Sequence, residues 1–482
     1  MGGLWSVVHH KRSVINIGFG KGINSYNDPL DLANDELTDS WNMCADDYPI
    51  IRTRNDRVLS SLPQSVGTLW GIGQRAQNEL HVLEGNTWKY GSHGSTAWTN
   101  ISTAIPSPAD PSFVEFNTQT DKYTIMAYST GAVYNGYWDG SVYSTFGDTN
   151  APKSNLYISH KNRLYGVAND GRTLRYCAQG DITDWTLAND AGYLDITEAQ
   201  GKITAVTGFA DHPILWTDNS MHEVYGSAYD NYQLVNVSRK IGCVSRHAYV
   251  ESGGRLFWLD YSGIYMYTGG LPRQIAHKAN GILDGINWNY KNLIRAGAVG
   301  DKIYFSIPYQ STANNMQLVI DMVEEKRKAA YTVNKEEGNW MGYANNSEKL
   351  YGLRSDGYVY DMNSTYKTGL DNSTAISWYL ETKPFHDEIN LESAVRDMWL
   401  QHSGTTLATM AVGFTTNDNS TTFTALAASS DFRHTEYSVR KVIHPSPVQL
   451  QGMGFMKFRL SGTGYKKISG LMINLISYGD VI

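Results

Sequence analysis

The chain has 482 residues, of which 41% are hydrophobic and 12% aromatic, so it is not intrinsically disordered and is long enough to bury a large core. Charged residues make up only 18%, and 40 Lys and Arg against 47 Asp and Glu give a net charge of −7. This acidic balance argues against a broad nucleic-acid-gripping surface, which needs an excess of cations. Three widely spaced cysteines, Cys44, Cys177 and Cys243, exclude a disulfide scaffold and favour assembly in a reducing cytosol.

The first 55 residues carry no repeat, and we predict that residues 1–55 form an extended N-terminal arm. The Gly-rich bend at residues 18–22 lacks the spacing of a nucleotide-binding loop. Leu32, Leu37 and Trp41 are compatible with a short helix over residues 31–43. Residues 23–51 contain seven acids and no Lys or Arg, which indicates either a solvated arm or a docking arm for a neighbouring subunit or adaptor. The candidate contact residues are Asp28, Asp31, Asp35, Glu36, Asp39, Asp46 and Asp47.

One unit recurs along the middle of the chain: a short apolar and aromatic strand, a polar turn, and a second strand that often ends in Tyr. The units begin at Leu80, Thr124, Leu164, Ile214, Leu256, Ile303 and Leu350, at intervals of 44, 40, 50, 42, 47 and 47 residues. A hairpin repeated with a period in the forties is typical of a β-propeller. We predict about seven blades, with six or eight possible. The segment around residues 50–62 is expected to complete the last blade, and the alternative is a stack of unrelated antiparallel sheets.

The pattern of apolar residues and turns changes near Lys383. A second short helix is compatible with residues 275–288. After residue 383 the hairpin units stop, and strands with alternating apolar residues follow. They cover residues 397–400, 409–414, 439–443, 455–460 and 471–475, which predicts a C-terminal β-sandwich. The predicted architecture is therefore all-β: an arm (1–55), a propeller (56–382) and a sandwich (383–482).

In blade 2, the unit that begins at Thr124, we place the second strand of the hairpin at Val133–Tyr134.

Motifs that carry catalytic chemistry are not recognisable. The 13 histidines are scattered, and neither H-E-x-x-H nor G-x-S-x-G occurs. The carboxylate pairs Asp46–Asp47 and Asp387–Glu388 are adjacent, so in a strand they would point to opposite faces and could not flank one bond. We therefore predict no catalytic, cofactor-binding or metal-binding residues and no enzyme activity. A propeller can still bring two distant carboxylates together at its axis, which the sequence does not decide.

Three stretches carry a resemblance to a known family. They are the opening with the Gly bend 18–22, residues 37–43 and residues 51–54; the stretch 201–308; and the stretch 414–475. Together with the order arm, propeller and sandwich, they make the chain resemble the tail-hub proteins of short-tailed bacteriophages, also called nozzle or packaged-DNA stabilisation proteins. Residues 96–155 depart from the family pattern.

This resemblance implies a structural virion protein, assembled in the host bacterial cytoplasm and located in the viral tail. Its subunits would form a homo-oligomeric ring, a hexamer, below the portal and its head–tail adaptor. The ring would continue the DNA channel, retain packaged DNA until ejection, dock tail fibres or spikes, and be closed by a tail tip or needle protein. DNA would pass without sequence-specific binding, and no cofactor or membrane span is implied. Two other classes stay open: a receptor-binding or glycan-cleaving phage tail protein on a propeller scaffold, and a cellular propeller scaffold.

Overall fold

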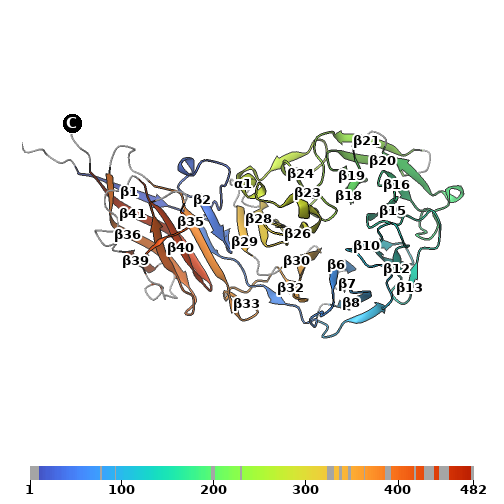
Figure 1. Ribbon diagram of the computed structural model, residues 1–482, viewed down its shortest axis with the longest axis horizontal. Helices are drawn as coiled ribbons and strands as arrows, with labels where there is room; N and C mark the ends of the chain where they lie inside the picture. The colour runs from blue at the N-terminus through green and yellow to red at the C-terminus, as the bar shows by residue number, and fades with distance from the viewer. Residues whose placement is uncertain are drawn as a thin grey trace, which may run out of the picture.

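The computed structural model consists of two β-sheet bodies, a round one and a flatter one, that lie side by side (Figure 1). It describes residues 10–75, 79–92, 94–196, 201–227, 231–322, 331–335, 339–345, 349–362, 364–385, 392–416, 420–427, 432, 439–443 and 455–478. Helices in these ranges are short: η1 (Pro29–Asp31), η2 (Leu187–Asn189), η3 (His277–Ala279), α1 (Asn280–Leu283) and η4 (Trp288–Leu293).

The round body is a β-propeller. The described ranges contain seven four-stranded antiparallel sheets arranged as blades around an axis (Figure 1). In order from the axis outwards, they are β6 (Leu69–Arg75), β7 (Glu79–Glu84), β8 (Thr87–Ser92), β9 (Thr99–Ser102); β10 (Ser112–Asn117), β11 (Lys122–Ala127), β12 (Gly136–Trp138), β13 (Tyr143–Thr145); β14 (Tyr157–His160), β15 (Arg163–Val167), β16 (Thr173–Tyr176), β17 (Gly192–Asp195); β18 (Ile203–Phe209), β19 (His212–Thr217), β20 (Met221–Tyr225), β21 (Gln233–Ser238); β22 (Tyr249–Ser252), β23 (Arg255–Asp260), β24 (Gly263–Tyr267), β25 (Arg273–Ile275); β26 (Arg295–Val299), β27 (Lys302–Ile307), β28 (Met316–Asp321), β29 (Tyr331–Lys335); and β30 (Trp340–Asn345), β31 (Leu350–Arg354), β32 (Val359–Asp361), β5 (Val58–Leu59).

The second strand of each blade explains why the repeat is visible in the sequence. In β23, four consecutive residues, Leu256 to Leu259, are fully buried, because neighbouring blades cover both faces of the strand. The turns that follow such strands use residues that accept positive φ, as Gly85 does between β7 and β8 with φ of 55°. Burial on both faces therefore gives each blade one continuous apolar run. The predicted propeller with seven blades is confirmed.

The last blade is closed by a strand from the other end of the propeller. β5 pairs with β32, with Leu59 opposite Tyr360 and Val58 opposite Asp361. The prediction that the segment around residues 50–62 completes this blade is confirmed. β5 and β32 lie some 300 residues apart in the sequence, and the hydrogen bonds between them close the ring of blades. Neither end of the propeller is then left with an unpaired strand.

Blade 2 differs from the prediction in one strand. Its second hairpin strand is β12, which starts at Gly136 rather than at Val133. The side chain of Asn135 accepts hydrogen bonds from the backbone N–H groups of Tyr128 and Ser129, at 2.9 and 2.8 Å. This closes the turn around residues 129–135, and the ladder resumes only beyond it.

The flatter body is a β-sandwich. One sheet has the order β2 (Leu37–Trp41), β35 (Ser377–Thr382), β40 (Lys457–Thr463), β37 (Ala411–Thr415) and β38 (Thr424–Ala427). The other has the order β3 (Met43–Asp47), β4 (Ile50–Thr53), β41 (Lys466–Tyr478), β36 (Glu392–Gly404) and β39 (Val439–Ile443), and β1 (His10–Ile17) pairs with β41. Buried Leu37, Ile51, Leu460 and Ile473 belong to its core. All five strand segments expected after residue 383 overlap strands of this sandwich.

The N-terminal segment differs most from the prediction. The described part of residues 1–55 is no separate arm, because β1 to β4 are strands of the sandwich. Residues 31–43 form no α-helix: η1 ends at Asp31 and β2 begins at Leu37, held by antiparallel pairing with β35. Residues 275–288 contain one helical turn, α1, preceded by η3. Pairing of β2 with β35, and of β1 and β4 with β41, joins residues more than 300 positions apart, so the conformation of the N-terminal segment leaves no local sequence signal.

The chain runs from the sandwich into the propeller and back. The propeller strands span residues 58–361, between β4 and β35, so the sandwich consists of residues 10–53 and 377–478 rather than of residues 383–482. Two segments cross between the bodies, around residues 54–57 and 364–376. The second contains a small hairpin, β33 (Leu370–Asp371) and β34 (Thr374–Ala375), which stands at the junction (Figure 1).

Candidate functional site

The seven candidate contact acids do not form a free docking arm. Five of them have partners within the chain: Asp35 with Lys21 at 2.7 Å, Glu36 with Lys278, Asp39 with the Tyr379 hydroxyl at 2.6 Å, Asp46 with Arg52 at 2.5 Å and Lys302 at 2.6 Å, and Asp47 with Lys467 at 2.9 Å. Asp28 is exposed and accepts the backbone N–H of Leu30 at 2.9 Å, while Asp31 is exposed at the end of η1.

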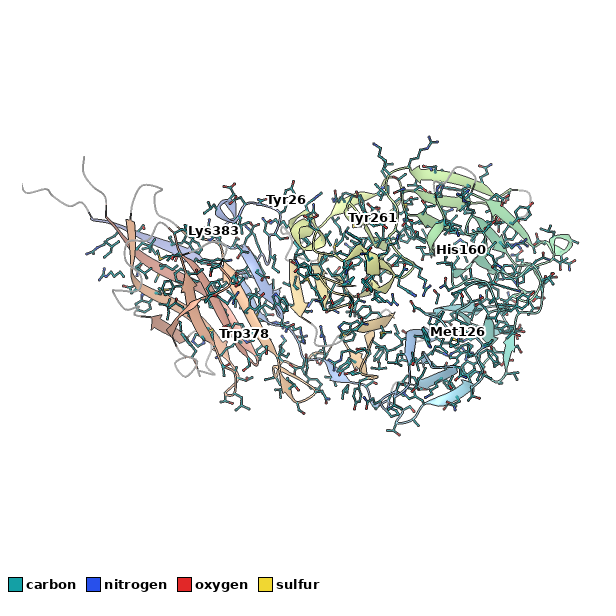
Figure 2. All side chains as sticks on the ribbon, in the orientation of Figure 1. Tyr26, Met126, His160, Tyr261, Trp378 and Lys383 are labelled. Carbon is teal, nitrogen blue, oxygen red and sulfur yellow. The ribbon has the colours of Figure 1, made fainter. Side chains whose placement is uncertain are left out.

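Two of these ion pairs connect the two bodies. Lys278 and Lys302 belong to the propeller, whereas Glu36 and Asp46 lie in the N-terminal segment of the sandwich. Burial opposes ionisation of Glu36, but hydrogen bonds from Lys278 and Asn24 outweigh it and lower its pKa. The acids thus act as intramolecular anchors. The loop that carries Asp28 and Asp31 lies at the junction, where Figure 2 labels its neighbour Tyr26.

A cluster of charged residues crosses the propeller axis. This axial cluster consists of Asp110, Arg246, His247 and Arg295. One carboxylate oxygen of Asp110 lies 2.5 Å from Arg246 Nη2, 2.6 Å from Arg295 Nη2 and 3.6 Å from His247 Nε2. Asp110 precedes β10, the other members lie just before β22 and at the start of β26, and Arg295 Nε also donates to the carbonyl of Met341 in β30 at 2.9 Å. Four blades are therefore tied together across the centre.

The charge state of the axial cluster does not suit acid–base catalysis. Burial opposes ionisation of Asp110, but Arg295, His247 and Arg246 hold its pKa well below the usual range. Burial lowers the pKa of His247 to about 4, although Asp110 acts in the opposite direction. At neutral pH the carboxylate is ionised and fully countered and the imidazole is neutral, so neither has a pKa poised for proton transfer. The arrangement is that of a structural clamp.

Carboxylates other than Asp110 also line the axial region. Cavities of about 240 and 400 Å³ flank the cluster; Glu251 lines the first and Glu115 the second. Asp387 and Glu388, the second adjacent pair of the sequence analysis, lie outside the described residues. Within the described ranges, no group of three or more His, Cys, Asp or Glu side chains could hold a metal ion.

Cysteine chemistry has no support in the structure. Cys44, Cys177 and Cys243 are all buried, and burial raises the pKa of Cys44 to about 11 and of Cys177 to about 12. Such thiols are not ionised at neutral pH and do not act as nucleophiles. Across the part of the chain that the structure describes, no helix is both long and apolar enough to traverse a bilayer.

A cavity that sequence reasoning missed lies between the two bodies. This cleft, of about 620 Å³, is bounded by the sandwich strands β2, β35 and β40, by the last blade and by the β33–β34 hairpin. Its sandwich wall presents Trp41 and Tyr379, whose rings stack with centroids 5.6 Å apart and an interplanar angle of 26°. Arg459 lies over the Tyr379 ring at 5.0 Å. These residues come from three distant segments, so no local motif could reveal them.

No family model and no curated protein matches the chain. Solved structures match at low identity: virginiamycin B lyase from Staphylococcus aureus (TM-score 0.44, 10% identity, covering 64% of this chain and 98% of that chain). YCF48 bound to a D1 peptide matches with TM-score 0.41 and 11% identity over 64% and 95% of the two chains. BamB from Moraxella catarrhalis matches with TM-score 0.37 and 10% identity over 64% and 97%. These similarities concern the propeller fold alone.

Proposed function

We propose that this protein is a structural component of a bacteriophage tail, a hub or nozzle that forms a ring below the portal and its adaptor. The observation that carries the proposal is the insertion of a propeller into a sandwich built from both ends of the described chain, with ion pairs fastening the two. A part that transmits force and docks other components needs such a rigid, multi-surfaced unit. The family resemblance also supports the proposal, although strands of the sandwich stand where a separate arm was expected.

The axial cluster supports a role without bond-making. A carboxylate held by two guanidinium groups and a neutral imidazole stabilises the fold and leaves no matched acid and base at that point. The axial cluster also bears on where DNA could pass. Because Asp110, Arg246 and Arg295 bridge the propeller axis, we assign the DNA channel to the space enclosed by several subunits and not to the propeller itself. A net acidic wall there would repel phosphate and reduce sticking during ejection.

The test uses the full-length chain together with DNA-filled heads that lack the hub. Negative-stain electron microscopy is expected to show a six-fold ring, free or attached below the portal, and the attached heads are expected to retain their DNA. A chain that stays monomeric, does not attach to heads and leaves DNA release unchanged would contradict the proposal. Hydrolysis of a surface polysaccharide by the isolated protein would favour the glycan-cleaving alternative instead.

A further inference from the structure

The sandwich wall of the cleft presents two aromatic rings, Trp41 and Tyr379, that lie outside the sandwich core, and Trp41 also packs against the propeller core. Along β35, Trp378 and Leu380 point into the sandwich core and are buried, while Ser377 and Tyr379 point to the opposite face, toward the cleft. Figure 2 shows Trp378 within the sandwich. Tyr379 is only partly buried, as is Trp41 beside it on β2. Alternation along the strand therefore places two large aromatic rings where solvent and a ligand can reach them.

The rings belong to a longer stacked row. Trp41 stacks on Tyr379, Arg459 lies over Tyr379 at 5.0 Å, and the same guanidinium lies over the ring of Phe423 at 4.2 Å. The row crosses the sheet from its edge strand β2 through β35 and β40 to the segment just before β38. A guanidinium held between two rings is fixed in place, so the platform is preorganised.

Each arginine of the cleft pairs with an acid, although Arg459 shares its acid with Lys457. Arg459 pairs with Glu381, and Arg54 pairs with Asp371 through both carboxylate oxygens, one of them at 3.0 Å. Arg354 donates from Nε to Asp356 at 2.8 Å. The cleft is thus rich in charged hydrogen-bonding groups but carries little excess charge. That pattern is unsuited to a phosphate polymer, whose binding depends on unpaired cations.

The opposite wall adds neutral polar groups. The β33–β34 hairpin turns through Asn372 and Ser373, which have φ of 43° and 72°, and exposes Asn372 and Thr374 beside the cleft. The volume of about 620 Å³ falls within the range of small-molecule sites, which bury most of a ligand of several rings.

We propose that this cleft binds a neutral saccharide of two to three rings. The apolar C–H groups of a sugar ring would lie against the parts of Trp41 and Tyr379 that line the cleft, and its hydroxyls would exchange hydrogen bonds with Asp371, Arg54 and Asn372. Sugars combine apolar ring faces with a rim of hydroxyl donors and acceptors, which is the combination that the two walls offer. A purely apolar peptide would offer no hydrogen bonds to Asn372 and Thr374, and burying polar groups without hydrogen-bond partners is costly. The inference goes beyond the proposed function and does not rest on it.

The experiment uses the full-length protein and a panel of neutral oligosaccharides of two to six hexose or N-acetylhexosamine units. Binding is screened on an array and measured by isothermal titration calorimetry. Trp41→Ala removes half of the platform and is expected to weaken binding about tenfold, the size expected for one lost aromatic contact. Trp399→Ala is the matched control, because Trp399 is a partly exposed Trp that lines a different cavity, on the other sheet of the sandwich.

A second variant guards against a folding defect in Trp41→Ala. Ser377 is exposed in the cleft, so Ser377→Gln fills the cavity without removing a buried group and is also expected to abolish or strongly weaken binding. Binding that survives both Trp41→Ala and Ser377→Gln overturns the proposal, as does a panel in which nothing binds. Binding of single-stranded DNA or of a protein partner in place of saccharide overturns it as well. Ring formation and head attachment are measured separately, so failure here does not decide the proposed function.

Discussion

The buried carboxylate of Asp56 helps to tie the two chain crossings between the bodies, together with the Arg54–Asp371 pair, and its removal should loosen the junction specifically. Asp56 is 3% exposed and accepts four hydrogen bonds from the returning segment. One oxygen accepts from the backbone N–H groups of Gly369 at 2.8 Å and Leu370 at 3.2 Å; the other accepts from Thr368 N at 2.9 Å and its hydroxyl at 2.6 Å. Asp56→Asn keeps one acceptor and turns an amide NH₂ toward two donors.

The expected cost follows from these contacts. Hydrogen bonds to charged groups contribute about 1.5–3 kcal/mol each, and two are lost while two lose their charge, so we expect about 3 kcal/mol of local destabilisation. At about 1.4 kcal/mol per factor of ten, amide hydrogen exchange in residues 364–376 should accelerate by about two orders of magnitude. Mass spectrometry of the peptides that cover this segment measures the effect.

The control is Asp28→Asn. Asp28 is exposed and accepts a single backbone N–H, so its replacement should change exchange little anywhere. If Asp56→Asn leaves exchange of residues 364–376 within about threefold of the parent, the carboxylate does not hold the crossing and the reasoning fails. A uniform acceleration over the whole propeller would also refute it, because it would mean global rather than local opening.

Four further outcomes follow from the structure. Asp110→Asn leaves the buried Arg295 without its counter-ion and should lower the free energy of unfolding in urea by about 3–5 kcal/mol, whereas Asp301→Asn at the exposed pair with Arg255 should cost less than about 1 kcal/mol. Burial lowers the pKa of His247 in the folded protein to about 4, below its unfolded value of about 6.5. The neutral imidazole therefore contributes its full stabilisation above pH 6.5, and this stabilisation is lost as the pH falls toward 4. The free energy of unfolding in urea should decrease over this range, and His247→Gln should flatten the dependence. Burial, with Glu381 nearby, raises the pKa of Asp39 in the folded protein above its unfolded pKa of about 3.9. The fold therefore loses stability as the pH rises above that unfolded pKa. Asp39→Asn should raise the melting temperature at pH 7 and not at pH 3. Replacing both Asp28 and Asp31 by Lys should leave unfolding unchanged but reduce attachment to DNA-filled heads, and unchanged attachment would remove these acids from the docking surface.

The propeller was predictable because its signal is local. Each of the seven lead residues, from Leu80 to Leu350, lies in the second strand of a blade, which is buried on both faces and so forms a continuous apolar run. Outer strands such as β9, with two exposed and two partly buried residues, carry no comparable pattern. A two-residue strand such as β5 was predictable only as a region, because its pairing with β32 is a property of ring closure.

The N-terminal segment and the candidate sites were not predictable for the opposite reason. Glu36 and Asp46 belong to a stretch without Lys or Arg, and their partners Lys278 and Lys302 stand more than 200 residues away. A solvated arm and a set of partly buried anchors therefore give the same local sequence. The cleft is similar: Trp41, Tyr379 and Arg459 become neighbours only through the order of strands β2, β35 and β40.

The same long-range pairing bears on how the molecule would work as a hub. The ion pairs of Asp46 with Lys302 and of Glu36 with Lys278 connect the two bodies at separate points, and the contacts of Asp56 with residues 368–370 tie the two crossings to each other. Two rigid bodies fixed at several points resist rotation about any one of them, so a load applied to the sandwich would reach the propeller without a hinge between them. Asp46 and Lys302 are partly buried, which protects their pair from salt more than full exposure would, since screening acts mainly on solvent-exposed charges. Rigidity at the junction should accordingly persist at ionic strengths that dissociate contacts made by the exposed Asp28 and Asp31.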